Sequence, residues 1–260
     1  MEIARMISVK TEEEMEAMRR VGRATAEVLD VVCRAVAPGV STWDLDQIVA
    51  QEFKIRGAES ASLGYAGRTC PFPAHACFSI NDEVVHGIPS PGRKVYAGDI
   101  LSIDLVGRLG GFMGDSTRTV AVGAVPSEVN LLLKATEAAL YEGIAVAVPG
   151  NRVGDISETI ESYAKKYRLS VVRELTGHGI GREMHEEPAI PNWGRKGTGP
   201  VLREGMTLAI EPMFLLGGDA LVFSEDGWTV RTADGKFAAH FEHTVAVTKS
   251  GPEILTALKN

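Results

Sequence analysis

The spacing of apolar residues predicts four helices, arranged as two pairs. Thr11 and Glu14 form a capping-box pattern at the start of the first helix. Pro38-Gly39 and Pro149-Gly150 separate the two members of each pair. The predicted helices cover residues 11–35, about 42–57, about 127–148, and a segment around 155–163. The same helix–helix order therefore occurs twice.

Each helix pair is followed by short strands with a matching chemical pattern. Leu101–Asp104 and Leu208–Glu211 both end an apolar run on a carboxylate, and Asp115 and Glu242 each open a strand that ends in V-A-V. Two helices followed by strands, repeated once, predict an α+β fold with helices on one side of a largely antiparallel sheet. We expect one catalytic domain over residues 1–260, with pseudo-repeat halves of about 11–123 and 127–248 that share one core. The site should lie where the two sheets meet.

The segment between Asp104 and Asp115 predicts a β-hairpin. With Leu109-Gly110 as its two-residue turn, antiparallel pairing places Asp104 directly opposite Asp115. Opposed side chains have Cβ atoms ~5 Å apart, and like charges at that distance are unfavourable. The pair then either has a raised pKa or binds a metal.

Repetition of the pattern points to a metal site. Two half-sites facing each other would collect Asp104, Asp115, Glu211 and Glu242, which a multivalent cation would neutralise. His178, in the segment T-G-H-G-I-G, is the nitrogen-bearing candidate. A single aspartate is more often on a solvated sheet face, and a single histidine is more often a hydrogen-bonded structural group.

Composition narrows the class of protein. The chain has 260 residues, 45% of them apolar, and a formal net charge of -7, which disfavours a general nucleic-acid binder. Its three cysteines and the absence of an export signal predict reduced thiols in a cytoplasmic protein. No apolar stretch reaches ~18 residues, so we expect no membrane span.

Six motifs closely resemble those of the type I methionine aminopeptidases, over nearly the whole chain. They are S-I-N-D-E-V-V-H-G-I-P ending at Pro89, G-D-I-L-S-I-D at 98–104, G-D-S-T-R-T at 114–119, T-G-H-G-I-G at 176–181, A-I-E-P-M at 209–213 and F-E-H-T-V at 241–245. The resemblance implies the pita-bread fold, two pseudo-symmetric halves around a dinuclear metal centre. No amino-terminal extension or long insertion is expected, which favours the short bacterial form.

The resemblance also implies a metal-ligand set and a cofactor. Asp115 and Glu242 would bridge two divalent ions, Asp104 would bind one ion, and His178 with Glu211 would bind the other. Oxygen-rich coordination with one imidazole suits manganese, iron(II), cobalt or zinc. Glu211 would also be the proton shuttle.

Further site residues follow from the same resemblance. His86 and His185 would hydrogen-bond the substrate backbone and stabilise the oxyanion; by themselves they are a loop histidine and a surface histidine. The methionine pocket would be lined by Tyr65, Phe72, Cys77, Met184 and Trp228, although each alone is more often a core residue. Met184 replaces a frequent phenylalanine, and residues 68–71 lengthen the loop between Tyr65 and Phe72.

The implied activity is removal of the N-terminal methionine from nascent chains, with a small second residue preferred. We expect a monomer, with Lys165-Lys166-Tyr167-Arg168 as a possible ribosome contact or, more simply, a solvated helix face. Three alternatives remain: an aminopeptidase P or prolidase, which would carry an additional amino-terminal domain, a non-catalytic binding module of the same fold, and a globular protein with an incidental acidic cluster.

Overall fold

The structure, a computed structural model, describes residues 7–67 and 70–258 and confirms the α+β class. The helices are α1 (Glu12–Ala35), α2 (Thr42–Ile55), α3 (Ser127–Ala145) and α4 (Val153–Lys166). The strands are β1 (Glu59–Ser60), β2 (Cys77–Ile80), β3 (Glu83–Val85), β4 (Ile100–Leu109), β5 (Phe112–Ala121), β6 (Ser170–Val171), β7 (Thr176–Gly179), β8 (Glu186–Pro191), β9 (Thr207–Ile210), β10 (Met213–Leu215), β11 (Leu221–Phe223), β12 (Val230–Thr232), β13 (Ala238–His240), β14 (Glu242–Thr248) and β15 (Gly251–Ile254). The predicted helix order is confirmed, and Thr11 with Glu14 forms the predicted capping box.

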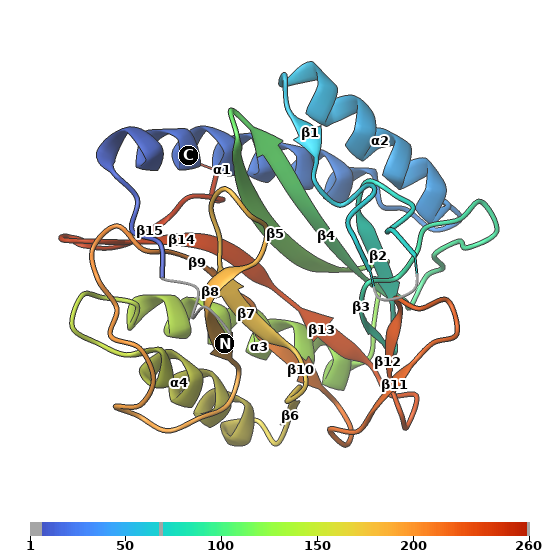
Figure 1. Cartoon of the computed structure of the whole chain (residues 1–260). Helices are drawn as coiled ribbons and strands as arrows, with labels where there is room; N and C mark the ends of the chain where they lie inside the picture. Colours follow the sequence, from blue (N-terminus) through green and yellow to red (C-terminus); the bar gives the residue numbers. More distant parts are fainter. Residues whose placement is uncertain (1–6, 68–69, 259–260) are drawn as a thin grey trace.

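One antiparallel sheet joins strands from both parts of the chain. Its order is β1-β4-β5-β14-β9-β7-β8, with β2 also pairing β4 and β15 also pairing β14. Two smaller three-stranded sheets, β13-β10-β6 and β11-β12-β3, complete the strands of the described residues. In Figure 1, α1 and α2 lie along the β4–β5 hairpin, whereas α3 and α4 lie along the strands of the C-terminal part. The two parts of the main sheet meet where β5 pairs with β14.

The helices pack on the sheet face opposite the carboxylates. Leu101, Ile103 and Leu105 alternate with Asp104 along β4 and are buried with residues of α1 and α2. Leu208 and Ile210 of β9 are buried with residues of α3 and α4. The other face of the sheet is therefore free to form the site.

Buried apolar residues gather beside each helix pair and also between the two parts of the chain. Each helix pair forms its own large apolar cluster with the strands beside it. A third cluster combines Met18 and Phe112 with Ile180 and Ala246 and so contains residues from both parts of the chain. Helix α1 therefore packs against residues of the C-terminal part as well as against its own hairpin, and the single shared core stays a prediction.

The predicted hairpin turn was wrong, by one residue. The turn is Gly110-Gly111, and both residues have positive φ, 61° and 81°, as a type I′ turn requires. Leu109 instead pairs with Phe112. Asp104 therefore lies opposite Thr117, and Asp115 lies opposite Val106. The two aspartates share one face but are diagonal neighbours, which leaves space for a cation between them.

No helix in the described ranges is both long enough and apolar enough to cross a membrane. Of the three cysteines, Cys33 is half-buried, Cys70 is exposed and Cys77 is buried.

Glycine allows α1 to pack closely on the hairpin. Gly107 and Gly114 pair across β4 and β5, and Thr25 of α1 donates a hydrogen bond to Gly114 O at 3.2 Å. A Cβ atom at Gly107 would lie 2.5 Å from Thr25 Oγ1 and 2.7 Å from Phe53 Cε1. Any side chain at this position would push the helices away from the sheet.

We expect Gly107→Ala to lower the free energy of unfolding by about 1–3 kcal/mol through overpacking. Urea denaturation followed by circular dichroism measures the change. Gly92→Ala is the matched control, because a Cβ atom at Gly92 meets nothing within 4 Å. Equal stability of the two variants would contradict the close packing of α1 on β4.

Candidate metal centre

Strand register collects the predicted acidic residues in adjacent rows on one face of the sheet. The first row runs across four strands and contains Cys77, Asp104, Thr117 and Glu242, which are paired in that order. His243 pairs with Ile210, so the same register places Glu211, which follows the end of β9, beside Glu242. The junction of β5 and β14 is thus the centre of the row, as predicted for the site.

The second row supplies Asp115 and His178. The Asp115 amide donates to Thr244 Oγ1, and this hydroxyl donates back to Asp115 O, both at 2.9 Å. Thr244 pairs with Ala209, and Ala209 pairs with His178. The small side chain of Ala209 leaves space above the sheet between His178 and the acidic residues.

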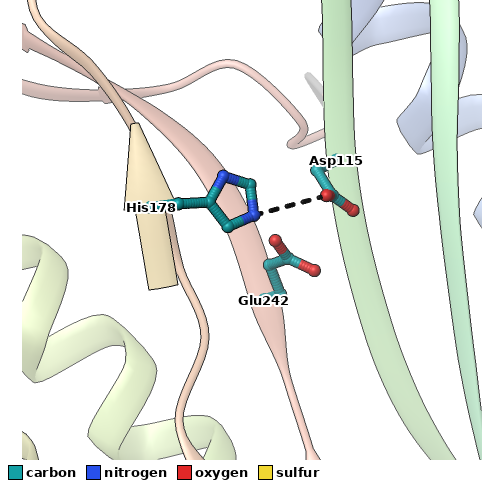
Figure 2. Close-up of side chains that lie close together, drawn as sticks. All are labelled: Asp115, His178 and Glu242. Atoms are coloured by element: carbon teal, nitrogen blue, oxygen red, sulfur yellow. Dashed lines mark ion pairs between the residues drawn. The ribbon is translucent and has the colours of Figure 1, made fainter. Parts of the chain in front are cut away.

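Asp115, His178 and Glu242 point toward one common space from three different strands (Figure 2). One potential ligand atom from each lies within 4.8 Å of those of the other two. His178 Nδ1 donates to Gly179 O at 2.8 Å, which leaves Nε2 as the electron-pair donor toward the acids. His178 Nε2 lies 3.9 Å from Asp115 Oδ2 and 3.6 Å from Glu211 Oε1.

Burial shifts every titratable group of this cluster toward its neutral form. The pKa values of Asp115, Glu211 and Glu242 are raised well above their usual range, chiefly by burial and then by repulsion from neighbouring carboxylates. Burial also lowers the pKa of His178 to about 3. The imidazole is therefore neutral, the form in which it binds metals.

The cluster fits a divalent cation. Asp115 Oδ1 and Glu242 Oε1 are buried and have no hydrogen-bond partner within the described chain. Thr117 Oγ1 donates to the other Glu242 oxygen at 2.8 Å, which orients that carboxylate. Unpartnered buried anions are strongly unfavourable, whereas a bound cation would satisfy both oxygens.

His240 is a site residue that the sequence did not predict. It precedes Glu242 by two residues, so it projects to the same face, and its Nε2 lies 3.4 Å from Glu211 Oε2 without hydrogen-bond geometry. Burial lowers its pKa to about 4. The alternation with Glu242 was the signal in the sequence that could have identified His240 as a site residue.

All twelve predicted site residues line one pocket of about 140 Å³. The pocket contains the five predicted ligands, both predicted substrate histidines and the five predicted methionine-pocket residues. Four residues that were not predicted complete it: Ser62, Val85, Val106 and His240. The structure therefore brings the predicted residues together, while their individual roles stay predictions.

Aromatic and sulfur-containing side chains form the wall of the pocket. Phe72 and Trp228 meet edge to face with ring centroids 5.1 Å apart, and Cys77 and Met184 are buried beside the same space. The backbone of Phe72 donates to Tyr65 O at 2.9 Å and closes the base of the loop between them. Of the four residues predicted to lengthen this loop, Arg68 and Thr69 lie outside the described residues, and Cys70 O accepts from Trp228 Nε1 at 3.2 Å.

The two predicted substrate histidines reach the pocket from separate loops. His185 Nδ1 lies 2.6 Å from Tyr65 OH, and its ring centroid is 4.4 Å from that of His178. His86 is 6.0 Å from Trp228 between ring centroids. Burial lowers the pKa of both, that of His86 to about 4, so both rings are neutral near pH 7.

The buried carboxylate–histidine centre on an α+β fold defines a candidate metalloprotein, and comparison with known proteins identifies the family. The chain belongs to metallopeptidase family M24, whose model matches residues 16–249. A methionine aminopeptidase from Clostridium acetobutylicum is 46% identical, with 96% of this chain and 99% of the relative covered. One from Aquifex aeolicus is 47% identical, with 97% and 99% covered. The resemblance found in the motifs is confirmed.

Solved structures confirm the predicted pita-bread fold. The crystal structure of methionine aminopeptidase from Thermotoga maritima superposes with a TM-score of 0.94 at 42% identity and covers 97% of this chain and 100% of that chain. Prolidase from Pyrococcus furiosus has a TM-score of 0.78 at 22% identity, with 97% of this chain and 66% of that chain covered. The likeness to prolidase extends to the fold alone.

We expect Asp115→Asn to have opposite effects with and without metal. The pKa of Asp115 is raised in the folded state, so its stabilising contribution is present at pH below the unfolded value near 4 and is lost as pH rises through the folded value. At pH 7.5 in chelator, the variant should therefore melt higher than the wild type, by roughly 2–4 °C for each kcal/mol of relieved repulsion. Added Mn²⁺ should raise the melting temperature of the wild type far more than that of the variant.

Differential scanning fluorimetry at pH 4.5 and 7.5, with EDTA or Mn²⁺, measures both effects. Asp219→Asn, on an exposed aspartate paired with Arg173, is the control and should respond to Mn²⁺ as the wild type does. An Mn²⁺-induced shift of wild-type size in Asp115→Asn would exclude this carboxylate from the metal centre.

Proposed function

We propose that this chain removes the N-terminal methionine from peptide chains, including nascent proteins, with the help of divalent metal ions. The observation behind this function is the combination of a buried carboxylate–histidine group with a small, largely apolar pocket in a chain of family M24. The curated relatives described above are methionine aminopeptidases, with 46% and 47% identity over nearly their whole length.

Asp104, Asp115, His178, Glu211 and Glu242 would hold two divalent ions. Four carboxylates balance two such cations in charge, and aminopeptidases are among the enzymes that use paired metals. When bound, the metals would polarise the scissile carbonyl and lower the pKa of the attacking water. Manganese, iron(II), cobalt and zinc all suit these donors.

The remaining steps belong to side chains of this protein. Glu211 would take a proton from the attacking water and deliver it to the leaving amine. Its position supports this role, because it lies between His178 and His240 at 3.6 and 3.4 Å. His86 and His185 would hydrogen-bond the substrate backbone, and neutral ring N–H groups would stabilise the developing oxyanion.

The pocket wall suits an unbranched thioether side chain. Cys77 and Met184 offer polarizable sulfur, and Phe72 and Trp228 offer ring edges and faces at the same space. The small volume and the polar floor would admit one residue with a free amino group, so only the first residue of a chain would be removed. A small second residue would be preferred, as the resemblance to the methionine aminopeptidases implies.

Partners and location follow from this function. The substrates would be N-terminal methionine peptides of nascent chains in the cytoplasm, and the chain would act as a monomer. At the predicted ribosome contact, Lys165 is exposed and pairs with Glu161, and Lys166 Nζ lies 5.3 Å from the centroid of the Tyr163 ring. These contacts suit an ordinary solvated helix face, so the ribosome contact stays a prediction.

A metal-reconstituted assay over tripeptides tests the function. We expect Met-Ala-Ser to be cleaved, Ala-Pro peptides to be left intact, and a methionine peptide with a bulky second residue to be cut slowly. Chelation should abolish turnover, and Mn²⁺ or Co²⁺ should restore it. Preference for the Ala-Pro substrate would favour a prolidase-like enzyme, while no cleavage of any peptide would favour a binding module.

We expect Glu211→Gln to lower kcat by about 10²–10⁴-fold, the range of a lost general acid–base. Because Glu211 would also bind metal, the metal content of the purified variant must be measured alongside turnover. Glu174→Gln, on an exposed glutamate outside the pocket, should keep wild-type kcat. Wild-type kcat in Glu211→Gln at full metal content would show that Glu211 does not transfer the proton.

A further inference from the structure

Glu83 is a buried glutamate outside the metal centre that is held by two arginines. Its exposed fraction is 3%. Arg93 donates to Glu83 Oε2, Arg231 donates to Oε1, and the Ile80 amide also donates to Oε2, at 2.8 Å. Both carboxylate oxygens are thus engaged in charge-assisted hydrogen bonds, which are strong and directional.

Arg93 connects Glu83 to the backbone on both sides of the turn between β2 and β3, and Arg231 connects it to the Asp82 side chain in that turn. Arg93 also donates to Ile88 O and, at 3.4 Å, to Phe78 O. Arg231 also donates to both carboxylate oxygens of Asp82, at 3.1 and 3.0 Å. The network therefore encloses the segment that contains His86.

His86 has a backbone conformation that such a network must hold in place. Its φ is 60°, in the left-handed region that is unfavourable for a residue with a side chain. At the adjoining Gly87, a Cβ atom would lie 2.8 Å from Glu83 Oε2 and 2.3 Å from Phe78 O. The Glu83 carboxylate is therefore packed directly against the backbone that follows His86.

The same network fixes His86 relative to the pocket wall. Arg231 lies on β12, which pairs with β3 so that Val230 is opposite Val85. Thr229, just before β12, donates to His86 O at 3.4 Å, and the neighbouring Trp228 contacts the His86 ring. Val85, His86 and Trp228 line the pocket, whereas Glu83 does not.

We propose that Glu83 is a positioning residue for His86: by joining Arg93 and Arg231, it holds residues 85–88 so that the His86 ring faces the substrate beside Trp228. This inference rests on the proposed function, because it gives His86 a contact with the substrate. A misplacement of about 1 Å at such a contact costs up to 10²-fold in rate.

A double-mutant cycle on Met-Ala-Ser cleavage tests the proposal. Glu83→Gln keeps the shape of the side chain but turns one acceptor into a donor that faces an arginine. We expect it to lower kcat/KM by about 10- to 100-fold in the wild type. In the His86→Ala background we expect almost no further loss, because a residue that acts only through His86 has nothing left to position.

Glu27→Gln is the matched control. Glu27 also accepts from two arginines, Arg23 and Arg56, but lies on α1 away from the pocket. It should leave kcat/KM unchanged in both backgrounds. The His86 ring signals in NMR spectra of ¹⁵N-histidine-labelled protein should move in Glu83→Gln and stay in place in Glu27→Gln.

Three results would overturn the proposal. The first is an equal loss from Glu83→Gln in both backgrounds, which would show a general structural role. The second is unchanged kcat/KM and unchanged His86 signals in Glu83→Gln. The third is wild-type kcat/KM in His86→Ala, which would show that His86 has no role in binding the substrate. A wild-type protein that cleaves no methionine peptide would instead refute the proposed function as a whole.

Arg231→Met provides a second variant if Glu83→Gln does not fold. The Arg231 side chain is 41% exposed, and Glu83 would keep its contact with Arg93. We expect a smaller loss of kcat/KM that again disappears in the His86→Ala background. A loss of equal size in both backgrounds would overturn the proposal in the same way.

Discussion

The burial of four carboxylates on one sheet face is the constraint on which the rest of the structure depends. Asp104, Asp115, Glu211 and Glu242 lie at the junction of β5 and β14, where water cannot solvate them fully. Their raised pKa values show that the fold by itself disfavours their charged forms. A cation held at this point would replace the repulsion by attraction between the two parts of the sheet. Electrostatic attraction would therefore link the stability of the fold to the binding of a cation.

The alternation of side chains along the strands places the acidic residues together on one face of the sheet. Residues that face the helices are apolar and are buried in two clusters, so the residues between them all face the opposite side. On that side, register aligns Asp104 with Thr117 and Glu242, and Thr244 with Ala209 and His178. Neither part of the chain holds the site alone, because β5 supplies Asp115 while β7 and β14 supply His178 and Glu242.

The loops above the sheet introduce the asymmetry that a peptidase needs. Tyr65, Phe72 and His86 come from the first part of the chain, and His185 and Trp228 come from the second. Their contacts are made across the junction, as in the 2.6 Å contact between Tyr65 OH and His185 Nδ1. The similar acidic rows below therefore meet a pocket whose two sides come from different loops.

By itself, the sequence determined the four helices and the capping box at Thr11, because periodicity and caps are local properties. The resemblance of its motifs to a known family supplied the twelve predicted residues of the pocket. The hairpin prediction was wrong although the sequence contained the signal, because two successive glycines accept the positive φ of both turn residues better than Leu109-Gly110 does. Prediction from the sequence also missed His240 as a residue of the pocket. Only the tertiary structure decided these points, because cross-strand register, the side of the sheet that each helix pair covers and the distances between ligand atoms arise from contacts between residues far apart in the chain.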